Sequence, residues 1–200
     1  MSEAMIYLER PISVEGHEVL YSELHAAGHD PVRVGLFLVD GQHTTRFPET
    51  LRDAVDGILN ADGFAAKVLE VRKAQMRRDI TATRDAAMAA GFTTDLADGS
   101  TITLQTRDQD RPHWLSALAL YQAAISAGDG SVQGATIRDS ADESHVLTYA
   151  EAAMVIVGMG LHGASIMADS WKAKDAVTNA ASLADLDAIS TLDPTSWAAL

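Results

Sequence analysis

Three glycines in the C-terminal half have the most recognisable chemical spacing in the chain. Gly158, Gly160 and Gly163 match Gly-x-Gly-x-x-Gly directly after the β-branched apolar run Val155 to Val157. In a dinucleotide-binding fold such glycines form a tight strand-to-helix turn that brings a pyrophosphate to the helix N-terminus. Only 37 residues follow Gly163, which is too few for the remaining strands of that fold. A nucleotide-binding enzyme using Gly158 to Gly163 is therefore the least favoured of three functional hypotheses.

A capping box just upstream argues for a helix at these glycines. Thr148 and Glu151 have the spacing at which each side chain caps a backbone N–H of the other. The pair predicts one helix from Tyr149 toward Asn179, in which Gly158 and Gly160 allow close packing of another backbone. The 17 uncharged residues from Ala152 to Ala168 are fewer than the ~20 that span a bilayer. We expect a buried helix and no membrane span.

Histidines and carboxylates offer few metal-binding patterns. His25 and His29 are four residues apart, as metal ligands on one helix would be. Gly28 and Pro31 weaken that helix, so we expect surface or loop histidines. Acidic pairs and triples also occur without the glycine and alternation of an EF-hand loop, and solvated turns are expected there. These groups are Asp108 and Asp110, and Asp139, Asp142 and Glu143. The sequence predicts no catalytic residue, no metal site and no cofactor.

Composition excludes several classes of protein. The 28 acidic residues outnumber the 15 basic ones, and a net charge of -13 disfavours nucleic acid as a partner. Cysteine is absent, which excludes disulfides, cysteine-ligated metals and thiol nucleophiles. Hydrophobic residues make up 47% of the chain, which favours a folded protein over a disordered one. The first ten residues lack the features of a signal peptide, so we expect synthesis in a cytoplasm.

The basic residues are concentrated in one segment. Six of the 15 lie between Lys67 and Arg84, including Arg77 and Arg78. A solvated helix face is one interpretation. The other is that the segment contacts acidic protein surface, because a molecule of this net charge repels a polyanion at distances beyond the ~8–10 Å Debye length.

The first 60 residues are expected to form a strand-rich N-terminal domain. Alternating Met5 and Tyr7, alternating Val19 and Tyr21, and the run Val32 to Val39 are typical of strands. Asp40-Gly41 is a turn dipeptide, and Pro48 suits the first turn of a helix.

A long connecting helix is expected over residues 61–91, since Phe64 to Ala90 contains neither Gly nor Pro and Gly91 suits its C-cap. Leu69 and Met76 are seven residues apart, and Ile80 follows four residues after Met76. This spacing is a thin coiled-coil seam, compatible with packing on neighbouring chains.

Residues 92–200 are expected to form a C-terminal domain with two hairpins and three helices. Asp98-Gly99 predicts the first hairpin, and Thr136 to Leu147 the second. Asp110 and Pro112 suit a helix start, and Ser182 begins a short last helix. Trp171 is a core or interface candidate. The expected fold class is α+β, with mainly antiparallel strands in the C-terminal domain.

The C-terminal half resembles an uncharacterised domain family of tail-fibre, tail-tip and tail-assembly proteins of tailed bacteriophages. The resemblance covers about Arg78 to Leu192 and consists of packing and turn residues. The matching residues are Gly91-Phe92, Asp98-Gly99, Arg107 to Arg111, Val146 to Thr148, Trp171 to Lys174 and Leu183 to Ile189.

This family implies a role in a phage virion or its assembly and implies no active site. The leading hypothesis is a structural protein of a bacteriophage tail, near the fibre, baseplate or tail tip, that binds other tail proteins. It predicts a homo-oligomer, with a trimer favoured, and localisation in the virion tail. The second hypothesis is a tail-fibre assembly chaperone that is absent from the mature virion. The interface and packing candidates are Leu69, Met76, Arg77, Arg78, Ile80, Gly158, Gly160 and Trp171.

Overall fold

The computed structural model describes residues 7–105, 109–191 and 193, and the chain divides into two compact units. Unit 1 comprises Met1–Met76 with Ala180–Asp187, and unit 2 comprises Arg77–Asn179 with Ala188–Leu200. The boundary falls inside the long helix α3, so this helix contributes to both units. The fold class is α+β, as predicted, and the strand pairs in the described part of the chain are antiparallel. The three-part division expected from the sequence stays a prediction.

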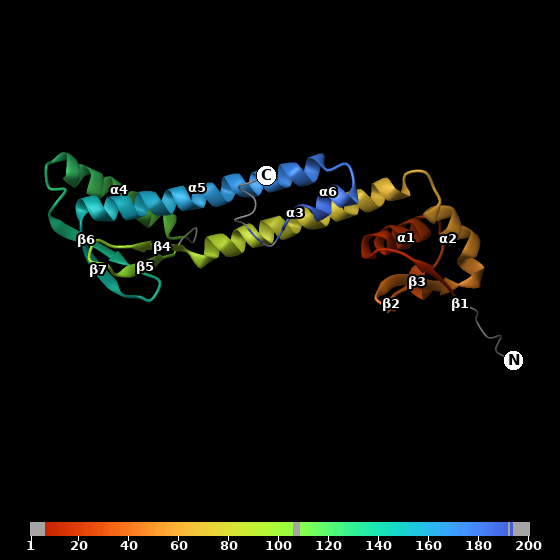
Figure 1. Ribbon diagram of the computed structural model, residues 1–200. Coiled ribbons are helices and arrows are strands. Elements are labelled where there is room, and N and C mark those ends of the chain that lie inside the picture. The colour runs from red at the N-terminus through yellow and green to blue at the C-terminus, as the bar shows by residue number, and fades with distance from the viewer. Residues whose placement is uncertain (1–6, 106–108, 192, 194–200) are drawn as a thin grey trace. The chain divides into compact units, whose positions relative to one another are not determined.

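Unit 1 is built on a three-stranded sheet with the order β1-β3-β2. The registers place Tyr7 opposite Pro48 and Gly35 opposite Arg46. The elements, drawn in Figure 1, are β1 (Tyr7–Pro11), α1 (Val14–Ala26), a 3₁₀ turn (Pro31–Arg33), β2 (Gly35–Val39), β3 (Gln42–Pro48), a 3₁₀ turn (Glu49–Leu51), α2 (Arg52–Leu59), the first part of α3 and α6 (Leu183–Asp187).

The core of unit 1 joins the helices to the sheet. Phe47 comes from β3 and Val55 from α2, and both side chains are fully buried. Leu20 and Leu24, four residues apart on α1, pack in the same cluster with Val34. Burial of these side chains gives the small unit its main favourable free energy.

The prediction of a strand at Val19 and Tyr21 was wrong, because both residues lie in α1. Ser13 caps this helix, and its hydroxyl accepts a hydrogen bond from the Gly16 backbone N–H at 2.9 Å. The side chains at this site are buried every four residues, at Gly16, Leu20 and Leu24, and that period is helical. Met5 lies outside the described residues.

The run Val32 to Val39 and the turn after it are confirmed with adjusted ends, whereas Pro48 ends β3 instead of lying in the first turn of a helix. β2 begins at Gly35 and not at Val32, because Asp30 caps a 3₁₀ turn through its carboxylate. The predicted turn at Asp40-Gly41 connects β2 to β3, and both residues have positive φ, 49° and 80°.

The long helix α3 spans Phe64–Ala90, the bounds predicted from the absence of Gly and Pro. Gly91 follows it with φ 86°, in the left-handed region that a C-cap glycine uses. A Cβ at Gly91 would collide with the backbone carbonyl oxygen of Leu104. The chain therefore enters β4 through a turn that only glycine fits.

Unit 2 contains two hairpins and two long helices besides the end of α3. In Figure 1, α4 runs alongside the N-terminal part of α5, and these helices make the main helix–helix contact of the unit. The hairpins are those predicted from the sequence. The elements are β4 (Phe92–Asp95), β5 (Thr101–Leu104), α4 (Arg111–Ser126), β6 (Gln133–Arg138), β7 (Ser144–Thr148) and α5 (Tyr149–Asn179).

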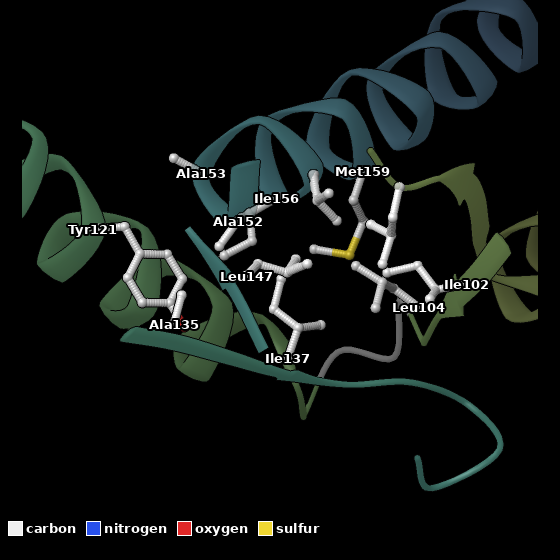
Figure 2. Packing of buried hydrophobic residues seen from close by; sticks show 12 residues of the cluster. Ile102, Leu104, Tyr121, Ala135, Ile137, Leu147, Ala152, Ala153, Ile156 and Met159 are labelled. Carbon is white, nitrogen blue, oxygen red and sulfur yellow. The ribbon is translucent and has the colours of Figure 1, made fainter. Parts of the chain in front are cut away.

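The core of unit 2 lies between the two hairpins and the start of α5. Figure 2 shows Ile102 and Leu104 from β5 and Ile137 from β6 meeting the α5 side chains Ile156 and Met159. The whole buried set is Leu96, Ile102, Leu104, Tyr121, Ala135, Ile137, Leu147, Ala152, Ala153, Val155, Ile156 and Met159. The N-terminal third of α5 is therefore the helix that holds both hairpins.

The predicted capping box at the start of α5 is confirmed. The Thr148 hydroxyl accepts a hydrogen bond from the Glu151 backbone N–H at 3.2 Å, and the Glu151 carboxylate accepts one from the Thr148 backbone N–H at 3.0 Å. These hydrogen bonds from Thr148 also lower the pKa of Glu151. The single helix that the box predicts, with its glycines inside, is the helix observed.

We expect Thr148→Ala to lower the free energy of unfolding by about 1 kcal/mol, because one backbone N–H at the start of α5 loses its acceptor. Thr148→Ser keeps the hydroxyl and is the control. Urea denaturation followed by circular dichroism measures both variants. Equal losses from the two substitutions would contradict the cap as the cause.

Candidate protein-interaction surface

Helix α5 has two apolar faces, and only one of them is covered. Seven of the nine buried positions follow one another at spacings of three, four or seven residues, which places them on one side of the helix. This covered face consists of Ala152, Ile156, Met159, Ile166, Ser170, Ala173 and Val177. The expectation of a buried helix was therefore right for one face only.

The opposite side of α5 carries apolar residues that the chain leaves exposed. We call it the outer seam and define it as Met154, Val157, Leu161, Ala164, Ala168 and Trp171. Met154, Leu161 and Trp171 retain 74%, 68% and 58% of their accessible surface. Trp171, a core or interface candidate from the sequence, is therefore outside the core. Contiguous apolar surface of this kind marks interaction sites in soluble proteins.

A groove between α4 and α5 borders the outer seam. The groove is mostly apolar and has a cavity volume of about 420 Å³. We call it the α4–α5 groove. A second, polar hollow, described below, has a volume of about 550 Å³. Leu115 stands at its edge with 67% of its surface exposed. The groove is lined by Met88, Arg111, Trp114, Leu115, Leu118, Ile156, Val157, Met159, Gly160, Gly163, Ala164 and Met167.

The three glycines of the Gly-x-Gly-x-x-Gly pattern all lie inside α5. A Cβ at Gly158 would lie 3.0 Å from the Phe92 ring, and one at Gly163 would lie 3.4 Å from the Met88 methyl group. A Cβ at Gly160 would meet nothing within 4 Å. The expected close packing of another backbone at Gly158 and Gly160 was therefore wrong: a side chain, the Phe92 ring, packs on Gly158, and Gly160 lines the groove. A strand-to-helix turn for a pyrophosphate is not formed by these residues.

The polar hollow lies where α4 faces the β6–β7 loop. It is lined by Gln105, Asp110, His113, Trp114, Ala117, Tyr121, Thr136, Arg138, Asp139, Ser140 and Asp142. Next to it, the possible metal ligands Asp139, Glu143 and His145 place one ligand atom each within 4.8 Å of one another. Of the groups in the described residues this one fits a cation best, because it combines two carboxylates with an imidazole.

The hydrogen bonds of Asp139 give this cluster a structural role. Its carboxylate accepts hydrogen bonds from the backbone N–H groups of Ala141 and Glu143, both at 2.9 Å, and lies 3.0 Å from His145 Nε2. The backbone hydrogen bond from Glu143, followed by the one with His145, lowers the pKa of Asp139. These hydrogen bonds close the β6–β7 turn. The neighbouring Asp108 lies outside the described residues.

The N-terminal histidines do not form a pair of ligands on one helix. His25 is in α1, which ends at Ala26, whereas His29 follows the helix. His17 is the histidine with an unusual environment, because its buried Nε2 lacks a hydrogen-bond partner. Burial lowers the pKa of His17 below 6.5, although a hydrogen bond to the Val34 backbone opposes the shift.

We expect His17 to make the stability of the chain depend on pH below neutrality. The unfolded chain binds a proton at His17 near pH 6.5, while the folded chain binds it only at lower pH. The free energy of unfolding therefore falls as the pH drops from 6.5 to the lowered pKa. Denaturation at several pH values measures the slope, which His17→Gln should flatten. His25→Gln, on the same helix, is the control and should leave it unchanged.

The basic segment is largely neutralised by the chain itself. Four of its six residues pair with carboxylates, as in the ion pair of Lys67 with Glu23 at 2.8 Å and that of Arg72 with Glu15 at 3.2 Å. Arg77 donates a hydrogen bond to Thr178 at 3.1 Å. Arg77 and Arg78 line an open hollow together with Lys174 and Asp85.

The expected seam on α3 is mostly covered by the chain. Met76 and Ile80 retain 2% and 0% of their surface, and Leu69 is half-buried. Lys73, at the polar position of the same seam, is also buried. These residues pack inside the chain, so this seam offers a partner little apolar surface. Trp197, the third tryptophan, lies outside the described residues.

The hydropathy of α5 also meets a criterion for membrane-spanning helices. Its 31 residues include an 18-residue window of mean hydropathy 1.4. Core helices of soluble proteins pass the same test, and one such helix among the described residues is weak evidence for a span.

Sequence reasoning did not single out the outer seam or Leu115. The spacing of three and four residues from Met154 to Trp171 was present in the sequence, but so was the equivalent spacing of the covered face. When both faces of a helix carry apolar residues, the sequence does not indicate which face the tertiary structure covers.

Comparisons with known proteins place the chain in a family. No curated protein and no solved structure matches it significantly. Residues 71–191, which include the end of α3, all of α4 and α5 and both hairpins of unit 2, match a single family profile. The match covers more than half of the chain, so the chain belongs to the family described as "Domain of unknown function (DUF4376)".

Proposed function

We propose that this chain is a structural protein of a bacteriophage tail, in the fibre, baseplate or tail-tip region, and that it acts through contacts with other tail proteins. The observation that carries the proposal is the outer seam with its groove. The resemblance of residues 78–192 to a domain family of phage tail proteins supplies the biological setting. The proposal requires no catalytic centre, no cofactor and no nucleic acid.

The apolar surface supports a protein partner on energetic grounds. Leu115 on α4 and Leu161 on α5 each expose about two thirds of their surface, at 67% and 68%. Covering such side chains gains roughly 25 cal/mol for each Å² of apolar surface removed from water. Because the chain is strongly acidic, this uncharged surface is also where another acidic protein approaches with least repulsion.

The second candidate is a tail-fibre assembly chaperone, and the lining of the α4–α5 groove favours it. Three methionines, Met88, Met159 and Met167, contribute to this groove. Methionine side chains are flexible and polarizable, so they adapt to different partners. A groove of this kind suits transient binding of an unassembled tail protein.

Mass spectrometry of purified phage particles tests the proposal. A structural protein is expected in fixed stoichiometry with known tail proteins. Presence in infected cells in complex with a tail-fibre protein, together with absence from particles, would support the chaperone. If the chain is found neither in particles nor in complex with a tail-fibre protein in infected cells, both candidates are overturned.

A pair of variants connects that experiment to the surface. Leu161→Glu places a charge on the outer seam and is expected to remove the chain from particles. Leu120→Glu is the matched control, since Leu120 exposes 64% of its surface and is not among the groove residues. Equal incorporation of both variants would show that the outer seam is not the contact surface.

A further inference from the structure

We propose that the outer seam of α5 pairs with the outer seam of a second copy of this chain, in an antiparallel arrangement with twofold symmetry. The inference deepens the proposed function, because it names the partner of the exposed apolar surface, and it replaces the trimer favoured from the sequence with a dimer. Its test uses the isolated chain, so that its outcome is separate from the presence of the protein in particles.

The spacing of the outer seam suits a helix as its partner. From Met154 to Trp171 the residues follow one another at intervals of three, four, three, four and three. This is the heptad period of the a and d positions at which helices interlock their side chains. The seam is about 26 Å long at 1.5 Å per residue.

The charge pattern favours a second identical copy. The chain has a net charge of -13, so two copies repel each other over most of their surface. No charged residue occurs from Ala152 to Ala168. The residues that flank the seam at the e and g positions are Gly158, Gly160, Ser165 and Met167, which are uncharged and mostly small. Two copies can therefore approach closely along this face.

The sizes of the seam residues select the antiparallel direction. Met154, Val157 and Leu161 occupy the N-terminal half, whereas Ala164 and Ala168 are in the C-terminal half. Antiparallel pairing places Leu161 opposite Ala164 and Val157 opposite Ala168, so that each central layer joins a large side chain to a small one. Parallel pairing would join leucine to leucine and alanine to alanine, which leaves layers of unequal width.

The charges at the ends of the seam agree with this direction. Glu151 and Lys172 both lie at e positions, just outside opposite ends of the seam. Antiparallel pairing brings e positions of the two copies together, so Glu151 of one copy comes near Lys172 of the other. Exposed pairs of this kind add little affinity, and a parallel arrangement does not form them, because e positions then face g positions.

Sedimentation analysis of the full chain over a range of concentrations tests the pairing. We expect a reversible monomer–dimer equilibrium, because a seam of two and a half heptads gives a small interface. Leu161→Glu should weaken dimerisation by at least tenfold, and Leu120→Glu should leave it unchanged. Circular dichroism establishes that both variants remain folded. A wild-type chain that stays monomeric would overturn the inference.

Cysteine cross-linking tests the direction, and the wild-type chain contains no cysteine that would interfere. The double variant Val157→Cys with Ala168→Cys is expected to form a covalent dimer on oxidation, since those positions face each other. Each single variant places its two cysteines eleven residues apart along the pair, about 16 Å, which is too far for a disulfide. A parallel dimer would instead cross-link through each single variant, and that result overturns the antiparallel pairing.

Two further outcomes separate this inference from other interpretations. The wild-type chain could instead stay monomeric and bind phosphatidylcholine–phosphatidylglycerol vesicles, with the binding lost in Leu161→Glu. That result would overturn the pairing and assign the seam to a membrane. A chain that dimerises and cross-links as expected but is absent from particles would support the inference and count against the structural role in the virion.

Discussion

Phe47→Ala is expected to lower the free energy of unfolding by roughly 3–5 kcal/mol. Phe47 retains none of its accessible surface and packs with Leu20, Leu24 and Val55 in the core of unit 1. The substitution removes the largest fully buried side chain described in the chain and leaves a cavity among neighbours that come from two helices and a strand. Urea denaturation followed by circular dichroism measures the loss.

The matched control for this variant lies in the same sheet. Phe37 on β2 keeps 44% of its surface exposed, and its ring contacts the Arg46 guanidinium at 4.9 Å from the ring centre. Phe37→Ala should cost only about 0.5–1 kcal/mol, the typical contribution of an exposed cation–π contact. Similar losses from the two substitutions would contradict the placement of the core.

Gly91→Ala should cost roughly 2–4 kcal/mol, for two reasons that act together. Its φ of 86° is unfavourable for an alanine, and the added Cβ collides with the Leu104 carbonyl oxygen. Because Leu104 pairs with Phe92 in the first hairpin, relief of the collision requires β5 to move. Chemical denaturation gives the size of the loss.

Two other glycines separate these causes. Gly128 has φ 98° but open space around it, so Gly128→Ala should cost only the backbone strain, about 1–2 kcal/mol. Gly160 is helical and also faces open space, so Gly160→Ala should stabilise the chain by about 0.5–1 kcal/mol. If Gly91→Ala and Gly128→Ala proved equal, the collision at Leu104 would not contribute.

The sequence by itself determined the elements whose signals are local. The bounds of α3 follow from the absence of Gly and Pro between Phe64 and Ala90, and the start of α5 follows from the capping box at Thr148. The turn at Asp40-Gly41 was predicted because its conformation depends on the residues of the turn itself. Such interactions span a few residues, so no knowledge of the rest of the molecule is needed.

The tertiary structure decided which apolar residues are covered. Val19 and Tyr21 fit the period of a strand, but Leu20 and Leu24 pack against Phe47 only when the segment is helical. In α5, Ile156 faces the hairpins while Leu161 faces solvent, although both are apolar residues of one helix. Burial depends on which elements meet in space, and contacts between residues far apart in the chain leave no local signal in the sequence. For that reason the outer seam, the surface on which the proposed function depends, became visible only in the folded chain.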